Sequence, residues 1–196
     1  MTKQSLPGEM AGDIANTVQS LPKHKGLPPV HSWNPPFCGD IDMRICRDGR
    51  WLYNGSVISR ESMVRLFSTV LRYDDDGCYY LVTPVEKVRI QVDDAPFIVT
   101  EMDVRMGNQG SEYRFRTSVG DEVVLNSEHN LWVEQDPVSG EPAPYIRVRD
   151  QLDALIHRNV FYELVERAAE VEIEGQTELI VTSQGQPYSL GRFDKE

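Results

Sequence analysis

The sequence has few of the residues and motifs that mark common enzyme and metal-site classes. Its three cysteines, at positions 38, 46 and 78, have no CxxC spacing, and its four histidines share no metal-ligand spacing. There is no GxSxG, Walker A, GxGxxG or HExxH motif. These absences argue against a disulfide framework, a structural zinc site and the enzyme classes that depend on those motifs.

Long apolar runs are also missing. Residues 1–26 contain no stretch that suits a signal peptide, and no later segment approaches the length of a membrane span. An odd number of unpatterned cysteines is typical of reduced thiols. We therefore expect a cytoplasmic protein.

Positive charge is scarce and unevenly placed. The formal net charge is −11, which argues against binding duplex DNA by bulk charge alone. The uneven distribution of this charge is compatible with a small anionic ligand as the partner. Residues 1–96 carry 11 Lys+Arg against 12 Asp+Glu, a net of −1, whereas residues 97–196 carry 9 against 19, a net of −10. An anion would therefore meet less electrostatic repulsion from the first half of the chain than from the second.

The stretch from 81 to 97 organises the chain. Val88, Ile90 and Val92 alternate with polar residues, which is typical of a half-buried strand. Asp93 and the residues up to Pro96 end that strand, because proline cannot donate to a ladder. We interpret this stretch as the join between two related halves.

The remaining patterns predict an α+β protein, mostly antiparallel β, with two main helices. Helices are expected over 59–73, with Ser59 as the N-cap, and over 150–168, capped by Asp150. Two strands, near 171–173 and 179–182, should close the fold, and the tail after Gln184 is expected to be loose. The expected divisions are an N-terminal helical arm and linker (1–30), a first unit (31–96) and a second unit (97–196).

The arm contains an apolar stripe of Met10, Ile14, Val18 and Leu21 at helical spacing, so it could dock on the body, on a partner or on a second copy. A weak repeat of strand, helix and strand starts at residue 51 and again at residue 145, about 100 residues later.

Three sets of residues are candidates for chemistry. Lys87 and Arg89 could meet an anionic group, although cross-strand charge pairing on an exposed face is the simpler interpretation. Asp40 and Asp42 could hold Mg²⁺, but a solvated strand face is the simpler interpretation because no third carboxylate stands at motif spacing. Trp51 could stack on a ligand ring or could be a core residue.

Two segments, HSWNPPFCGDIDMRICRDGRWLYNGSVISRESMVRLFSTVL and GCYYLVTPVEKVRIQVDDAPF, resemble an uncharacterised bacterial family, domain of unknown function 1285. The resemblance implies duplicated α+β units, with the C-terminal unit similar to a pleckstrin-homology-like barrel. It also implies a groove between the units for a nucleotide-like ligand and a role in signalling. The family supplies no catalytic residues.

We expect a non-enzymatic ligand-binding or sensing module without a cofactor. Side-chain chemistry and position select its candidate ligand-binding residues, which are Arg44, Trp51, Glu86, Lys87, Arg89, Asp93 and Asp94. The alternative is a metal-dependent hydrolase or transferase that uses Asp40 and Asp42. A third possibility is an adaptor that binds a protein partner or a second copy through the N-terminal arm.

Overall fold

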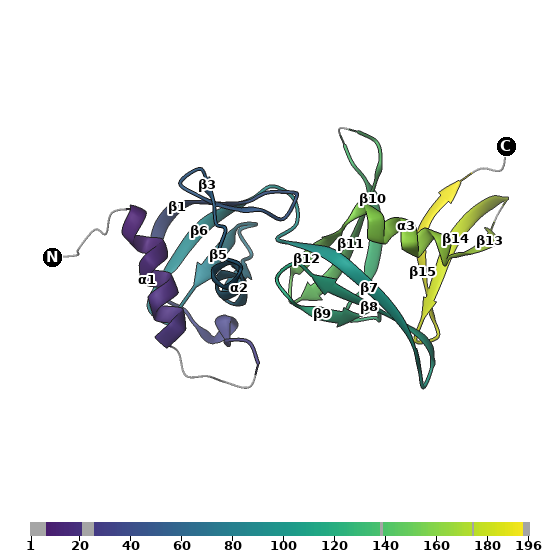
Figure 1. Ribbon diagram of the computed structural model, residues 1–196, viewed down its shortest axis with the longest axis horizontal. Helices are drawn as coiled ribbons and strands as arrows, with labels where there is room; N and C mark the ends of the chain where they lie inside the picture. The colour runs from purple at the N-terminus through teal and green to yellow at the C-terminus, as the bar shows by residue number, and fades with distance from the viewer. Residues whose placement is uncertain (1–6, 21–25, 138, 174, 194–196) are drawn as a thin grey trace. The chain divides into compact units, whose positions relative to one another are not determined.

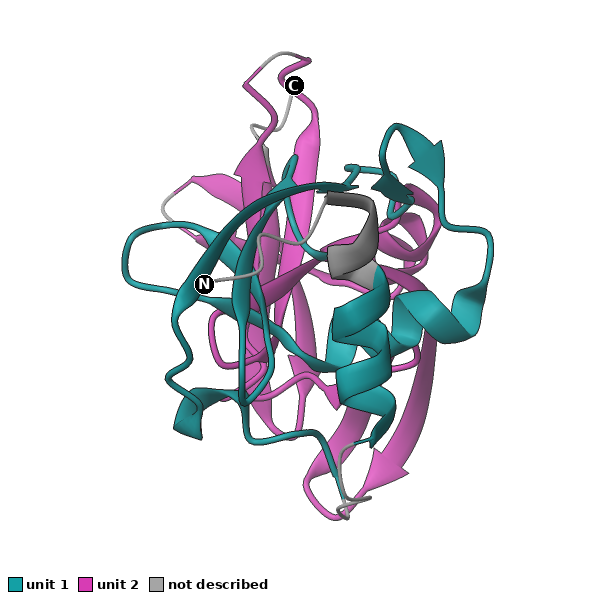
Figure 2. Ribbon diagram, turned by 90° about the vertical axis from the view of Figure 1, so that its left-hand side faces the viewer, with its two compact units in different colours: residues 1–96 teal, residues 97–196 magenta. Residues whose placement is uncertain are grey.

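The structure is a computed structural model and describes residues 7–20, 26–137, 139–173 and 175–193. The chain divides into two compact units, residues 1–96 and residues 97–196, which Figure 2 colours separately. Strands dominate both units, and three α-helices occur in the described ranges (Figure 1). The predicted class, mostly antiparallel β with duplicated units, is confirmed. Among the described residues, no helix is long and apolar enough to cross a membrane.

The first unit is a six-stranded sheet in the order β3-β2-β1-β6-β5-β4. Its central pair, β1 and β6, is parallel, and every other pair in the sheet is antiparallel. The strands are β1 (Phe37–Ile45), β2 (Trp51–Tyr53), β3 (Ser56–Val57), β4 (Leu71–Tyr73), β5 (Tyr79–Val82) and β6 (Lys87–Val92).

Helix α2 (Glu61–Thr69) contributes to the core of this unit. The ring of Phe67 stacks on that of Trp51 with centroids 6.4 Å apart, and both side chains are buried. The prediction for this helix was wrong at both ends. Arg60, not Ser59, occupies the N-cap, and Leu71 lies in β4, where it pairs with Leu81 of β5. Tertiary pairing therefore ends the helix before its apolar pattern does.

The N-terminal arm forms helix α1 (Pro7–Ser20). Ile14 and Val18 are buried, and the helix packs against α2 and β1. Leu21 and the side chain of Met10 lie outside the described residues. The described part of the apolar stripe is thus used within the first unit itself. A short 3₁₀ helix, η1 (Val30–Ser32), follows before β1.

The second unit has a six-stranded sheet with the same topology, β10-β11-β12-β7-β8-β9. Its central pair, β7 and β12, is again parallel, and the flanking pairs are antiparallel. The strands are β7 (Phe97–Gly107), β8 (Gly110–Thr117), β9 (Glu122–Val124), β10 (Leu131–Gln135), β11 (Pro142–Arg149) and β12 (Leu152–Ile156).

The duplication is real, but the predicted alignment of the two halves was wrong. Strand β7 begins 60 residues after β1 (97 against 37), and β12 begins 65 residues after β6 (152 against 87), not about 100. The helices do not correspond either. Helix α2 lies between the third and fourth strands of its unit, whereas α3 (Arg158–Glu166) follows the sixth strand of the other.

The helix predicted over 150–168 is in fact a strand followed by a shorter helix. Leu152, Ala154 and Ile156 are buried at alternate positions of β12, and Asp150 occupies the preceding turn with a φ of +48°. Helix α3 begins later, where the His157 side chain accepts a hydrogen bond from the backbone N–H of Asn159.

A three-stranded sheet, β13-β14-β15, completes the second unit. Its strands are β13 (Ala169–Ile173), β14 (Gln176–Ser183) and β15 (Gln186–Phe193). The tail predicted to be loose therefore contains a strand, with Tyr188 and Leu190 buried. Gln184 and Gly185 both have positive φ, as a two-residue hairpin turn requires, and this turn returns the chain as β15.

Candidate functional site

The parallel pair of β1 and β6 presents a row of charged side chains on one face of the first sheet. Alternation buries Val88 and Ile90 of β6 on the opposite face, together with the apolar residues of β1. We call the polar side the charged face. It consists of Asp40, Asp42 and Arg44 from β1, Lys87 and Arg89 from β6, and Asp93 directly after β6.

Ion pairs join the two strands across the charged face. Arg89 donates from Nε and Nη2 to the two carboxylate oxygens of Asp40, both at 2.7 Å. Arg44 donates from Nε to Asp93 at 2.6 Å. The hydrogen bond from Arg89 lowers the pKa of Asp40 and raises that of the guanidinium. The two arginine side chains are about half exposed, so solvent screens both pairs and they add little to the stability of the fold.

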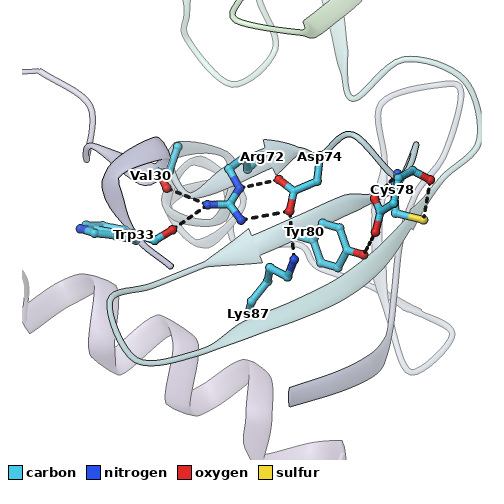
Figure 3. A network of polar contacts seen from close by, with 8 residues as sticks. Val30, Trp33, Arg72, Asp74, Cys78, Tyr80 and Lys87 are labelled. Carbon is cyan, nitrogen blue, oxygen red and sulfur yellow. Dashed lines mark hydrogen bonds and ion pairs between the residues drawn. The ribbon is translucent and has the colours of Figure 1, made fainter. Parts of the chain in front are cut away.

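A more buried network, shown in Figure 3, holds Lys87. The Asp74 carboxylate accepts hydrogen bonds from Lys87 Nζ at 3.0 Å and from Arg72 Nε and Nη2 at 2.5 and 3.0 Å. Arg72 also donates from Nη1 to the backbone carbonyls of Val30 and Trp33, both at 2.9 Å. Burial by itself would raise the pKa of Asp74, but the hydrogen bonds from the two cations outweigh it and hold the pKa below its usual value.

Aromatic side chains lie beside these cations. The Lys87 ammonium is 4.2 Å from the centroid of the Tyr80 ring, and the Tyr80 hydroxyl donates to Asp76 at 2.5 Å. That hydrogen bond, together with burial, raises the pKa of Tyr80 to about 12. Phe37 meets the Tyr80 ring edge-on at 6.1 Å and is 55% exposed. An exposed aromatic ring therefore stands next to a half-buried cation.

Sequence reasoning missed Phe37 because simple alternation gives no reliable position for it. The register between β1 and β6 shifts between Phe37 and Asp40, and Gly39 between them has a φ of +108°. A shift of one residue turns a side chain to the other face of the sheet. The signal available in the sequence was the glycine itself, which marks a bulge when it falls within a strand pattern.

Several of the predicted site residues lie together on the charged face, and another, Trp51, lies in the core. Trp51 is 2% exposed and stacks on Phe67, so the structure favours its alternative interpretation as a core residue. Glu86 is half-buried, and burial followed by the nearby Asp13 carboxylate raises its pKa. Asp94 lies 3.0 Å from Nε of Arg47. Lys87 and Arg89 remain at the centre of the charged face.

The metal alternative gains no support from this geometry. Both oxygens of Asp40 are taken by Arg89. Within the described ranges, no group of three or more His, Cys, Asp or Glu side chains is arranged to hold a metal ion. The three cysteines are free thiols.

The second unit contains a cavity of about 260 Å³ among β7, β8 and β9, and none of the predicted site residues lines it. Three arginines contribute to its lining, and each lies close to a carboxylate on the same strands. The pairs are Arg105 with Asp103 at 2.6 Å, Arg114 with Glu112 at 2.9 Å, and Arg116 with Glu122 at 2.6 Å. Two of these pairs lie within one strand and the third joins β8 to β9, so we interpret these side chains as charge pairs on the strand surface. We place the candidate site on the charged face of the first unit.

Two family models match the chain and divide it where the structure does. The model of "Domain of unknown function (DUF1285), N-terminal domain" matches residues 28–95, and that of "Protein of unknown function (DUF1285), C-terminal domain" matches residues 96–190. Their common boundary falls within a residue of the boundary between the two compact units. No curated protein matches the chain.

Two solved structures are similar to this chain. A DUF1285 family protein from Silicibacter pomeroyi DSS-3 has 45% sequence identity and a TM-score of 0.79, covering 90% of this chain and 93% of that one. A second DUF1285 family protein, from Shewanella baltica OS155, has 28% identity and a TM-score of 0.49, covering 63% of this chain and 90% of that one. With both family models matched in sequence order, the chain belongs to the DUF1285 family.

Proposed function

We propose that the chain is a non-enzymatic sensing module and that the charged face of its first unit binds a small, nucleotide-like anion. The observation that carries the proposal is the exposed Phe37 ring against Tyr80, a residue that Lys87 and Arg89 also adjoin. Phe37 contacts Tyr80, the Lys87 ammonium lies over that same ring, and Arg89 pairs with Tyr80 in the adjacent strand. A planar ring can stack on Phe37 while its phosphate meets Lys87 and Arg89.

The existing ion pairs leave hydrogen-bond donors of Lys87 and Arg89 available for such a ligand. A guanidinium has five N–H donors and an ammonium three, so neither cation is exhausted by one carboxylate. The Asp40 side chain is 59% exposed, so water can replace its contacts and displacing it from Arg89 costs little free energy. A phosphate that replaces this carboxylate gains charge-assisted hydrogen bonds from the same two nitrogens.

The hydrogen-bond network of Figure 3 connects the proposed site to the segment that precedes β1. An anion at Lys87 competes with Asp74, and Asp74 also holds Arg72. Arg72 in turn fixes the carbonyls of Val30 and Trp33, which belong to the segment between α1 and β1. Ligand binding would thus loosen or shift that segment, and a partner protein would detect the change. We place this activity in the cytoplasm, where free thiols such as those of this chain persist.

A thermal-shift screen over mononucleotides, dinucleotides and inorganic phosphate tests the proposal, with calorimetry on any hit. We expect a nucleotide to raise the melting temperature. Phe37→Ala and the double variant Lys87→Ala with Arg89→Ala should each remove the shift. Val57→Ala, a similarly exposed apolar residue of β3, and Arg65→Ala, an exposed arginine of α2, serve as matched controls. A flat response over the whole panel, or a shift that survives the double variant, contradicts the proposal.

A further inference from the structure

Strand β13 has an open backbone edge. It occupies the outer position of the three-stranded sheet, and β14 is its only strand partner in the described chain (Figure 1). Four of its five residues are exposed, and Ile173 is half-buried. The free edge of such a strand presents unpaired N–H and C=O groups to any extended chain. The other five-residue edge strand of this unit, β10, packs against β15.

The two faces of β13 differ in chemistry. Glu170 and Glu172 lie on one face by alternation, and Ala169, Val171 and Ile173 lie on the other. A strand added along this edge would place its own residues directly opposite these positions, alternately next to a carboxylate and next to an apolar side chain. The pattern that complements β13 is therefore an alternation of basic and apolar residues.

We infer that β13 accepts an extended segment of a partner protein as a fourth strand, and that this segment alternates basic with apolar residues. Backbone hydrogen bonds along the edge would provide affinity, and the side-chain alternation would provide specificity. The net charge of −10 over residues 97–196 attracts a basic segment at longer range. This inference is independent of the ligand proposed for the first unit.

A second copy of this chain is a poorer occupant of the same edge. Antiparallel self-pairing centred on Val171 puts Glu170 opposite Glu172 of the other copy, twice. Centring the pairing on either glutamate puts that residue opposite its own counterpart. Like charges directly opposite each other destabilise a strand pair, so the glutamates oppose self-association and favour a basic partner.

The experiment titrates the full chain with a short peptide of alternating lysine and valine and follows backbone amide resonances by NMR. We expect shifts at residues 169–173 and new protection of amides on the free edge from hydrogen exchange. Two control peptides separate strand addition from charge attraction. One is the same peptide with its central residue replaced by proline, which cannot donate a backbone hydrogen bond to the ladder. The other alternates glutamate and valine.

A charge-reversed protein, Glu170→Lys with Glu172→Lys, should bind the lysine peptide about tenfold more weakly and should bind the glutamate peptide instead. Equal binding of the proline-containing peptide, or shifts spread over the acidic surface and absent from β13, would overturn the inference. So would concentration-dependent dimerisation of the unmodified chain through this strand. Circular dichroism of the double variant checks that it is folded, and Glu163→Lys with Glu166→Lys, on exposed positions of α3, is the matched charge control.

Discussion

Asp74 accepts hydrogen bonds from Arg72 through both of its carboxylate oxygens, two residues along the same segment of chain. The same carboxylate also holds Lys87, 13 residues away on β6. One side chain therefore couples the edge strand β4, the charged face and the segment that precedes β1. The side chains of Asp74, Arg72 and Lys87 are only 20%, 11% and 21% exposed, so solvent replaces these contacts poorly.

The first prediction concerns this carboxylate. Asp74→Asn should lower the free energy of unfolding by about 1–3 kcal/mol at pH 7, because two half-buried cations lose their shared partner. The pKa of Asp74 is lower in the folded state, so its contribution is present above the unfolded pKa of about 3.9 and is lost as pH falls through the folded pKa. Urea denaturation at pH 7 and in acid measures the change. The difference in the free energy of unfolding between variant and wild type should shrink in acid. Asp48→Asn, which removes one partner of an exposed ion pair in a turn, is the control and should change stability little at either pH.

The second prediction separates two aromatic residues. Trp51→Ala should destabilise the first unit by about 3–5 kcal/mol, because it leaves a large cavity against Phe67. Phe37→Ala, at an exposed ring, should change stability little and should act only on ligand binding. Chemical denaturation of both variants provides the comparison. A large loss of stability in Phe37→Ala would mean that its ring is structural.

The third prediction concerns Glu86, whose pKa is raised in the folded state by burial and by the Asp13 carboxylate. The folded protein binds this proton more tightly than the unfolded chain, so stability falls as pH rises above the unfolded value of about 4.3. Glu86→Gln removes the buried charge and should stabilise the protein slightly at pH 7, by less than about 1 kcal/mol. The gain should disappear in acid. Glu61→Gln, on the exposed start of α2, is the control, and an equal gain there would contradict this explanation.

The fourth prediction tests the strand found where a loose tail was expected. Leu190→Ala in β15 should cost about 2–5 kcal/mol, because its side chain is 3% exposed. Pro187→Ala, at an exposed position of the same strand, should cost much less. Thermal unfolding followed by near-UV circular dichroism reports on both variants. Equal, small effects would show that β15 adds little to the fold.

The sequence determined the mostly-β class, the strand β6 and the polar side of that strand, because alternation of Val88 and Ile90 with Lys87 and Arg89 is a local property that a strand displays directly. It also determined the helical arm and the family. It did not determine where the helix predicted over 150–168 begins. The apolar residues from Leu152 to Ile156 satisfy both the spacing of a helix and the alternation of a strand, and only pairing with β7 and β11 makes this segment the strand β12.

The candidate site also has a part that the sequence predicted and a part that only the tertiary structure decided. Lys87, Arg89 and Asp93 could be named from the sequence because charges on a half-buried strand must face away from the core. The ion pairs that they form could not be predicted, since Asp40 and Arg44 lie 49 residues away from Arg89 and Asp93 and meet them only when β1 and β6 pair. Tertiary packing also placed Trp51 in the core and Phe37 at the surface, because burial depends on which elements cover a ring, and sequence alone does not contain that information.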